Sequence, residues 1–382
     1  MTRKDRLMAT IRGERADRAP VCFYELNGLD QNENSADPFH VYTHPSWRPL
    51  LELTREKTDR IVMRGMRFKR NGPDALEGLA TRREHADGGG TWYSVTEIRA
   101  GDRVLTSRAM RRPDVDTVWT TEHLLKDEDD LRAWLALPES GDIGAPDFSH
   151  FAEAEARLGD TGIVMIDIAD ALCHVAGLFS MEDYTVVALT EQALFHRALE
   201  KVQEKLLRQV EAVARGWPGR LWRVCGPEYA APPYLPPRLY EEYVVKYDRP
   251  LVDIIHRHGG YARLHQHGRC RDVLDMTVQT GCMGLDPIEP PPQGDVSLEY
   301  VRQRHGEQLV LFGNLELSDI ETLSENAFAP KVLAALEQGT AGAGRGFVLM
   351  PSACPIGRAL SDTALRNYFR LIQEYEVFYG ID

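Results

Sequence analysis

A strand–helix–strand unit in the middle of the chain decides the fold. It consists of Leu221-Trp222-Arg223-Val224-Cys225, a helical pattern over 237–258, and Tyr261-Ala262-Arg263-Leu264. A short apolar run that recurs after a helix predicts two parallel strands joined by a crossover. Eight such runs occur along the chain. The other six are Val21-Cys22-Phe23-Tyr24, Arg60-Ile61-Val62-Met63, Gly162-Ile163-Val164-Met165-Ile166, Cys282-Met283-Gly284-Leu285, Gln308-Leu309-Val310-Leu311-Phe312 and Gly346-Phe347-Val348-Leu349-Met350.

Helical patterns separate most of these runs. The clearest covers 190–215, where apolar residues recur at helical spacing, and two more cover 326–338 and 363–379. Eight strands alternating with helices favour a closed (β/α)8 TIM barrel over an open doubly wound sheet. One such barrel fits 382 residues, so we expect an α/β chain with a single domain over 1–382 and a helical extension before the first strand.

One region breaks the alternation. Asp87-Gly88-Gly89-Gly90 is followed by β-rich runs over 91–96 and 103–107, which Ala100-Gly101-Asp102 separates. These runs predict antiparallel strands joined by a tight turn. We therefore expect a β-rich insertion at about 66–120, carried on the barrel.

The charge and cysteine content narrow the function classes. The chain has 45 Lys and Arg against 58 Asp and Glu, a net charge of −13, which argues against a general nucleic-acid binder but leaves room for a local basic pocket. No apolar run approaches the ~20 residues needed to cross a bilayer. The six cysteines are scattered without a CxxC pair, which suits a reducing compartment. We expect a cytoplasmic protein that does not bind membranes.

Polar side chains follow nearly every predicted strand, and in a barrel the carboxyl ends of the strands meet at one rim. A convergent site is therefore expected there, although any single carboxylate is equally well explained as a helix cap or loop partner. These side chains are Glu25 and Asn27, Asp167 and Asp170, Glu228 and Tyr229, His265 and His267, Asp286 and Glu289, Asn314 and Glu316, and Ser352 and Cys354.

The two histidines after the fifth strand are the sharpest feature. Residues two apart in an extended segment face the same side, so His265 and His267 can reach one transition metal. Cys354 after the eighth strand could add a thiolate. Three protein ligands with an open fourth position describe a catalytic zinc site. The alternative is that the histidines hydrogen-bond a substrate carboxylate without a metal.

The sequence offers little evidence for other functional motifs. Gly342-Ala343-Gly344-Arg345-Gly346 is rich in glycine but precedes a strand, so it lacks the context of a dinucleotide loop and is interpreted as a turn. The chain contains no Walker loop, HExxH or GxSxG motif.

Several segments resemble the uroporphyrinogen decarboxylase superfamily. They are Arg3-Lys4-Asp5-Arg6 through Arg18-Ala19-Pro20-Val21, His265-Gln266-His267-Gly268, Asp286-Pro287-Ile288-Glu289-Pro290-Pro291-Pro292-Gln293-Gly294-Asp295, and Gly313-Asn314-Leu315-Glu316. The resemblance covers nearly the whole chain. It implies a (β/α) barrel that often forms a homodimer.

The resemblance also distinguishes two chemistries. True uroporphyrinogen decarboxylases bind a tetrapyrrole through an Arg-Gln-Ala-Gly-Arg motif, whereas this chain has Phe23-Tyr24-Glu25-Leu26-Asn27-Gly28-Leu29, without arginine. The negative charges of Glu25 and Glu228 would also repel a substrate with many carboxylates. The second branch comprises corrinoid-dependent methyltransferases with zinc in a His-x-Cys … Cys pattern. Here His267 replaces the middle thiolate, which leaves a bound zinc more positive and a stronger Lewis acid toward oxygen. An oxygen-bearing substrate, such as a methoxy compound, is therefore expected rather than a thiol.

The resulting hypothesis is a zinc-dependent methyltransferase that passes a methyl group between a small substrate and a corrinoid carried by another protein, because the chain lacks an Asp-x-His-x-x-Gly signature. The alternatives are a metal-free decarboxylase or lyase acting on a small carboxylic acid, and a binding protein without turnover. The expected metal ligands are His265, His267 and Cys354, the expected fourth ligand or general acid–base is Glu228 or Glu289, and the expected substrate contacts are Glu25, Asn27, Asp167, Tyr229 and Asn314.

Overall fold

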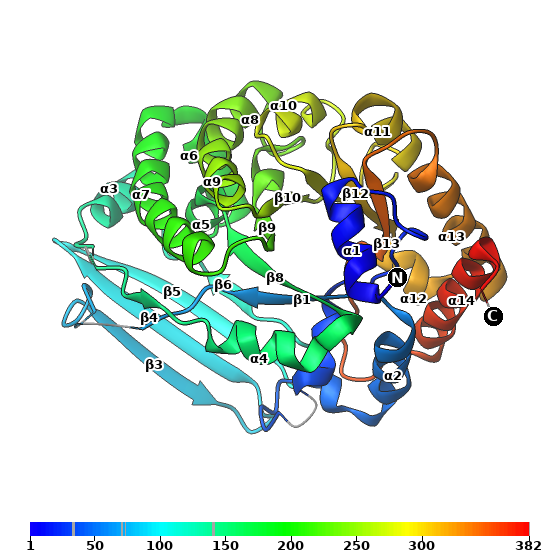
Figure 1. The fold of residues 1–382 in the computed structure, drawn as a ribbon. Coiled ribbons are helices and arrows are strands. Elements are labelled where there is room, and N and C mark those ends of the chain that lie inside the picture. The colour runs from blue at the N-terminus through cyan, green and yellow to red at the C-terminus, as the bar shows by residue number, and fades with distance from the viewer. Residues whose placement is uncertain (33–34, 70–71, 73, 140–141, 382) are drawn as a thin grey trace.

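A parallel sheet of seven strands forms the centre of the computed structural model, which describes residues 1–32, 35–69, 72, 74–139 and 142–381. Each strand pairs with its neighbour in the order β1-β8-β9-β10-β11-β12-β13. The sheet curls with helices outside it (Figure 1), which confirms the predicted barrel architecture. The strands are β1 Arg60–Gly65, β8 Gly162–Ala169, β9 Leu221–Cys225, β10 Tyr261–Gln266, β11 Gly284–Pro287, β12 Val310–Leu315 and β13 Gly346–Pro351.

Residues 20–22 occupy the eighth strand position and join the two edges of this sheet. Leu349 N donates to Pro20 O and Cys22 N donates to Leu349 O, both at 2.9 Å, while Asp59 N donates to Val21 O at 2.7 Å. The predicted strand over 21–24 is thus shorter than expected. Tyr24 has a φ of 52°, which ends the extended backbone, and the chain continues as a 3-10 helix over Tyr24–Asn32.

The helices follow the predicted alternation. The pattern over 237–258 is divided into α8, a π-helical turn over Glu241–Val245, and α9. The helices are α1 Arg3–Arg12, α2 Arg48–Lys57, α3 Glu128–Leu135, α4 Ser149–Leu158, α5 Ala171–Ala176, α6 Met181–Thr190, α7 Gln192–Gly216, α8 Pro237–Tyr240, α9 Lys246–Arg257, α10 Leu274–Gln279, α11 Leu298–His305, α12 Leu317–Thr322, α13 Glu325–Thr340 and α14 Asp362–Tyr379. No helix in the described part of the chain is long and apolar enough to span a bilayer.

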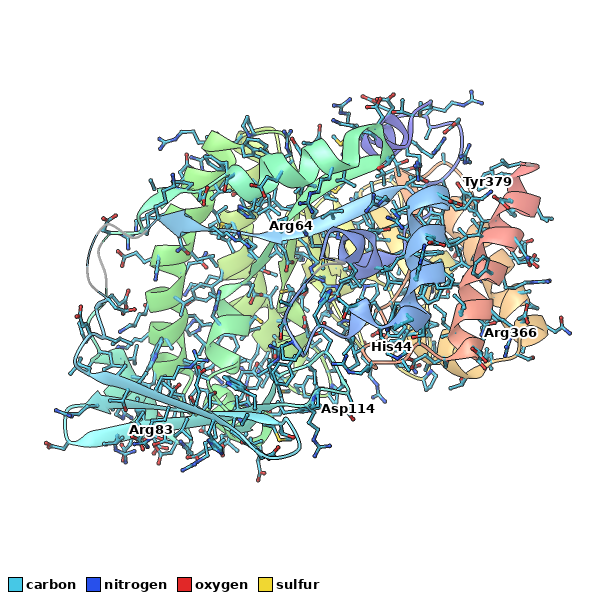
Figure 2. All side chains as sticks on the ribbon, turned by 90° about the horizontal axis from the view of Figure 1, so that it is seen from below. His44, Arg64, Arg83, Asp114, Arg366 and Tyr379 are labelled. Atoms are coloured by element: carbon cyan, nitrogen blue, oxygen red, sulfur yellow. The ribbon has the colours of Figure 1, made fainter. Side chains whose placement is uncertain are left out.

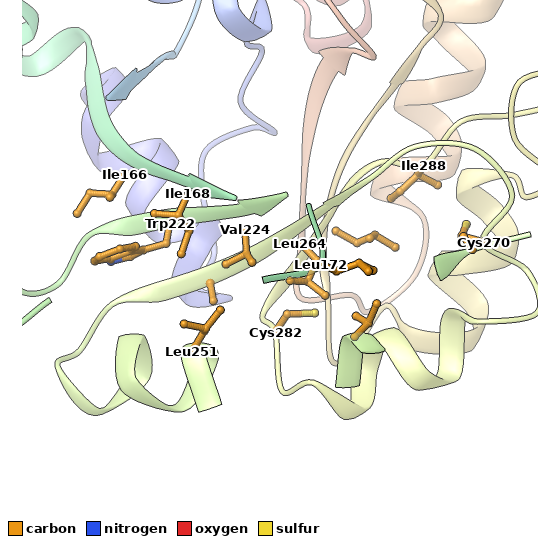
Figure 3. Packing of buried hydrophobic residues seen from close by; sticks show 14 of the residues in the cluster. Ile166, Ile168, Leu172, Trp222, Val224, Leu251, Leu264, Cys270, Cys282 and Ile288 are labelled. Carbon is orange, nitrogen blue, oxygen red and sulfur yellow. The ribbon is translucent and has the colours of Figure 1, made fainter. Parts of the chain in front are cut away.

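Two apolar clusters hold the barrel. The larger lies between the strands and the outer helices, and Figure 3 shows Ile168, Trp222 and Val224 of the strands in the same packed layer as Leu251 of α9. The smaller lies inside the barrel and includes Leu7 of α1. Helix α1 therefore covers the amino-terminal end of the barrel and leaves the carboxyl end for a site.

The predicted β-rich insertion is confirmed between β1 and β8. Its four-stranded antiparallel sheet has the order β3-β4-β5-β6, with the tight turn of the central hairpin after Ala100 as expected. The insertion runs past the predicted limit of residue 120, because β6 ends at Glu122 and α3, β7 and α4 still precede β8. Figures 1 and 2 show this sheet, which carries Arg83, as a flat layer beside the barrel. Its strands are β3 Ala80–Ala86, β4 Trp92–Ala100, β5 Arg103–Arg111 and β6 Trp119–Glu122, and a separate pair is β2 Phe68–Lys69 with β7 Ala145–Pro146.

Candidate active site

Two imidazoles lie together at the carboxyl end of β10. The ring centroids of His265 and His267 are 4.5 Å apart and their planes are nearly perpendicular. Nδ1 of His265 lies 2.8 Å from Asp286 Oδ2, and Nδ1 of His267 lies 2.8 Å from Glu289 Oε1. A carboxylate on Nδ1 fixes the ring orientation and directs Nε2 to another partner. We call these four residues the imidazole pair with its carboxylates.

The carboxylates of this group are ionised. Burial would raise the pKa of Asp286, but Arg263 and His265 outweigh it and hold that pKa at about 2. Burial likewise opposes ionisation of Glu289, yet its hydrogen bond and charge interaction with His267 lower its pKa. Burial would lower the pKa of His267, and the contact with Glu289 reverses this and raises it. The raised pKa favours the protonated, positively charged form of His267 at the rim.

A second group, formed by Tyr24, Arg223, Asp167 and Glu25, lies against the first. Arg223 donates to both oxygens of Asp167, with N···O distances of 2.5 and 3.1 Å, and also to the hydroxyl of Tyr24. The Tyr24 hydroxyl lies 3.4 Å from Nδ1 of His265 and so links the two groups. Arg223 comes within 3.8 Å of Glu25 as well. The guanidinium of Arg223 on β9 thus contacts Asp167 of β8 and two side chains, Tyr24 and Glu25, that follow residues 20–22.

Cys354 lies beyond this second group. Its Sγ donates to Glu25 Oε2 at 3.3 Å and lies 3.6 Å from the hydroxyl of Tyr42. Burial and the neighbouring Glu25 carboxylate raise the pKa of Cys354 well above the ordinary thiol value. The thiol is thus protonated and engaged with Glu25, while the imidazoles are engaged with other carboxylates. Among the described residues, no three His, Cys, Asp or Glu side chains form a group placed to hold a metal ion.

Glu316 is a carboxyl of this rim whose pKa is raised toward neutrality. It follows β12, is only 6% exposed, and its Oε2 accepts a long 3.5 Å hydrogen bond from Ser352. Burial first, then the charges of Glu289 and Asp319, raise its pKa to about 7. A carboxyl that is half protonated near neutral pH is suited to general acid–base chemistry. Its place after the seventh strand was visible in the sequence, but its pKa depends on burial that only the fold supplies.

The remaining predicted residues are spread around the rim. Glu228 Oε2 accepts from Gly226 N at 3.2 Å, and burial raises the pKa of the neighbouring Tyr229 to about 12. Asn314 lies at the carboxyl end of β12 and is partly exposed. Asn27 is not at the rim. It is fully buried, and its amide contacts Cys22 Sγ and Tyr24 O and accepts from Thr58, so it holds the segment after residues 20–22 in place.

Arg223 and Arg263 were not singled out from the sequence. Each interrupts an otherwise apolar strand, which was the available signal, because a buried cation needs a carboxylate partner. Arg223 pairs with Asp167, and Arg263 Nε lies 3.1 Å from Asp286 Oδ1.

Comparison with known proteins identifies the family. The family model described as "Uroporphyrinogen decarboxylase (URO-D)" matches residues 171–374, more than half of the chain. The chain belongs to the uroporphyrinogen decarboxylase family. The URO-D match includes His265, His267, Glu316 and Cys354, so most of the rim lies in the family segment. No curated protein matches the chain.

One solved structure shares the fold of this URO-D chain over nearly its whole length. The chain is similar to a methyltransferase from Methanosarcina mazei, with 17% identity, a TM-score of 0.60 and 99% of each chain covered. It also matches a D-psicose 3-epimerase from Clostridium cellulolyticum H10, with 10% identity, a TM-score of 0.33, and 62% of this chain and 94% of that one covered. The first likeness extends over the whole barrel and its insertion, and at this identity it concerns the fold.

Proposed function

We propose that this chain is a methyltransferase that moves a methyl group between a small substrate and a corrinoid carried by a separate protein. The observation that carries the proposal is the pair of imidazoles at the barrel rim, each held through Nδ1 by a carboxylate. Membership of the URO-D family and the fold shared with a methyltransferase support it. The six cysteines are all free, which suits the reducing cytoplasm in which we expect the protein to act, as a homodimer.

Zinc fits the residues of this site only in part. His265 and His267 are suited to it, because their carboxylates leave both Nε2 atoms for another partner. Cys354 is not, because its thiol is protonated and hydrogen-bonded to Glu25. Zinc bound to the two imidazoles would act as a Lewis acid toward a substrate oxygen. A third thiolate ligand would require the contact between Cys354 and Glu25 to break.

The acid–base work is assigned to this chain's own carboxyls. When a methyl group leaves a methoxy oxygen for cobalt(I), the bonding electron pair stays on the oxygen, which then needs a proton. Glu316 is the residue proposed to deliver it, since its pKa of about 7 leaves it half protonated at neutral pH. Glu289 is ionised and keeps His267 oriented, and Glu228 remains the second candidate for proton transfer. Asp167, Tyr229 and Asn314 are proposed to contact the substrate.

The second candidate is a metal-free decarboxylase or lyase. The raised pKa of His267 favours it, because a protonated imidazole at the rim can bind a substrate carboxylate. In that case His265 and His267 would bind an anion rather than a metal.

Corrinoid spectroscopy tests the first proposal. Protein without an affinity tag is mixed with cob(I)alamin or methylcob(III)alamin and a panel of methoxy, methylamine and thiol compounds. We expect conversion between the two corrinoid spectra with a methoxy compound, and a loss of at least tenfold in rate for E316Q. Carbon dioxide release from a carboxylic acid without any methyl transfer would instead support the lyase.

Metal analysis separates the two candidates further. Near-stoichiometric zinc that disappears in H265A supports the methyltransferase, with H258A, altered outside the site, as the matched histidine control.

The E25Q variant tests whether Cys354 can become a zinc ligand. Removing the charge of Glu25 should lower the pKa of the Cys354 thiol and so speed its alkylation by iodoacetamide. Peptide mass spectrometry measures the rate of this alkylation. Higher zinc content in E25Q than in the wild-type protein would support Cys354 as a ligand.

A further inference from the structure

A cavity of about 550 Å³ lies at the amino-terminal end of the barrel. It is bounded by the segment after α1, residues 13–19, and by the segment that joins α13 to β13, residues 339–346. The six residues of β13 separate it from the rim that carries the candidate active site, a rise of about 20 Å. It is therefore distinct from the proposed catalytic site.

Four arginines line this cavity, which we call the arginine cavity. They are Arg15, Arg18, Arg302 and Arg345, and Glu14 is the carboxylate among the lining residues. Arg18 lies 3.6 Å from Asp17. The other three arginines have no carboxylate within ion-pair distance in the described part of the chain. A concentration of unneutralised cations in a protein with a net charge of −13 indicates a site for an anion.

Arg302 is the most constrained of the four. It is 8% exposed, and its guanidinium donates only to the carbonyl oxygens of Gly306, Gly339 and Gly346, while its Nε has no partner among the described residues. The Gly306 and Gly339 carbonyls lie at the carboxyl ends of α11 and α13, where a cation is favourable, and the Gly346 carbonyl lies at the start of β13. They explain why Arg302 is held there, but they are neutral and leave its charge uncompensated.

Two glycines, one after α1 and one before β13, let the side chains of Arg345 and Arg302 lie close to the backbone. A Cβ on Gly344 would lie 2.0 Å from Nη1 of Arg302, and a Cβ on Gly13 would lie 3.0 Å from Cγ of Arg345. Nε of Arg345 is buried and has no hydrogen-bond partner among the described residues. The sequence Gly342-Ala343-Gly344-Arg345-Gly346 is thus a turn, as interpreted, and it also brings Arg345 and Arg302 to the same cavity.

We propose that the arginine cavity binds a small molecule that carries phosphate and is larger than inorganic phosphate itself. Guanidinium groups match phosphate oxygens with paired, charge-assisted hydrogen bonds. The volume of about 550 Å³ falls in the range of ordinary ligand sites, well above the size of one phosphate ion. Tyr379 and Phe347 give the cavity an aromatic wall for the organic part of the ligand. This proposal does not depend on the function of the rim.

Calorimetric titration of the whole protein tests it, with orthophosphate, pyrophosphate, ATP and adenosine as probes. We expect ATP and pyrophosphate to bind more tightly than orthophosphate, adenosine not to bind, and affinity to fall as salt rises. R345A and R15A should each weaken ATP binding at least tenfold. R366A is the matched control. Figure 2 shows Arg366 and Tyr379 at opposite ends of α14, so this variant should bind as the wild-type protein does.

A second set of variants guards against misfolding. R302A removes three hydrogen bonds and is expected to destabilise the chain. Two other variants are therefore used. G344A displaces the Arg302 guanidinium, and R345K keeps the charge but loses the planar guanidinium. Both should weaken ATP binding while circular dichroism remains unchanged. Absence of binding by every phosphate probe at millimolar concentration would overturn the proposal. So would equal affinities of R345A and R366A, or binding of a polyglutamate peptide without binding of any phosphate.

Discussion

Nδ1 of His267 lies 2.8 Å from Oε1 of Glu289, whose other oxygen accepts from Gly268 N at 2.7 Å. One carboxylate therefore fixes both the ring and the backbone turn that follows it. Replacing the Glu289 carboxylate with a neutral amide should free the His267 ring to change its orientation. For E289Q we expect a loss of about 10- to 100-fold in activity or metal affinity, as is usual for a partner of a functional histidine. Because the His267 side chain is 39% exposed, stability should fall by only about 1 kcal/mol.

Histidine nitrogen NMR and urea denaturation check this expectation. The matched control is E325Q, since Glu325 lies on the surface beside Arg366. Unchanged activity in E289Q would exclude an orienting role for Glu289.

Glu316 predicts an unusual dependence of stability on pH. Its folded-state pKa is raised to about 7, so the folded protein is penalised for ionising it. The penalty is absent below the unfolded pKa, grows as pH rises toward 7, and is complete above that value. E316Q should therefore be more stable than the wild-type protein at pH 8, by at most about 3 kcal/mol, and similar to it at pH 4. Activity of the same variant should fall.

Urea titrations at the two pH values measure this difference. A stability change in E316Q that is the same at both would show that the carboxyl is not titrating between them.

Arg223 is expected to be essential for the order of the rim. Replacing it with methionine leaves the Asp167 carboxylate without its cation, and we expect a loss of about 2–3 kcal/mol in the free energy of unfolding. Lysine keeps the charge but cannot donate to both oxygens of Asp167, so R223K should lose less, about 1 kcal/mol. Equal stabilities for the two variants, measured by chemical denaturation, would mean that the charge of Arg223 contributes little.

Leu264 tests the packing between strands and helices. It is fully buried in the layer that Figure 3 shows, and truncation to alanine should cost about 2–5 kcal/mol. Leu189 is 37% exposed and gives a matched control, since L189A should change stability by less than about 0.5 kcal/mol. Thermal unfolding of both variants provides the comparison, and a mild effect in L264A would indicate that the layer repacks around the gap.

The sequence was sufficient for the barrel because its signal is periodic. Short apolar runs and helical patterns predict strands and helices locally, and alternation then fixes a parallel sheet. Tyr24 could not be anticipated, because its left-handed backbone depends on the contacts that hold residues 20–22 between two strands. For the same reason, the sequence indicated which side chains could bind a metal but not how far apart they lie. The separation of Cys354 from the two histidines depends on Glu25, Tyr24 and Arg223 lying between them.

No local sequence pattern predicts the arginine cavity. Arg15, Arg302 and Arg345 come from three distant segments, and each is an ordinary arginine in its own surroundings. Only the closed fold brings their charges together, although the overall charge left room for a local basic pocket.

Residues 20–22 bond to β13, which is the last strand of the sheet along the chain. During synthesis the first strand position therefore emerges from the ribosome long before its partner exists. Until then the growing sheet has an open edge at which other chains could pair. The final closure joins segments separated by more than three hundred residues, a long-range contact of the kind that slows folding. A chain truncated before β13 should consequently stay trapped as an open, aggregation-prone sheet, however complete its other helices and strands.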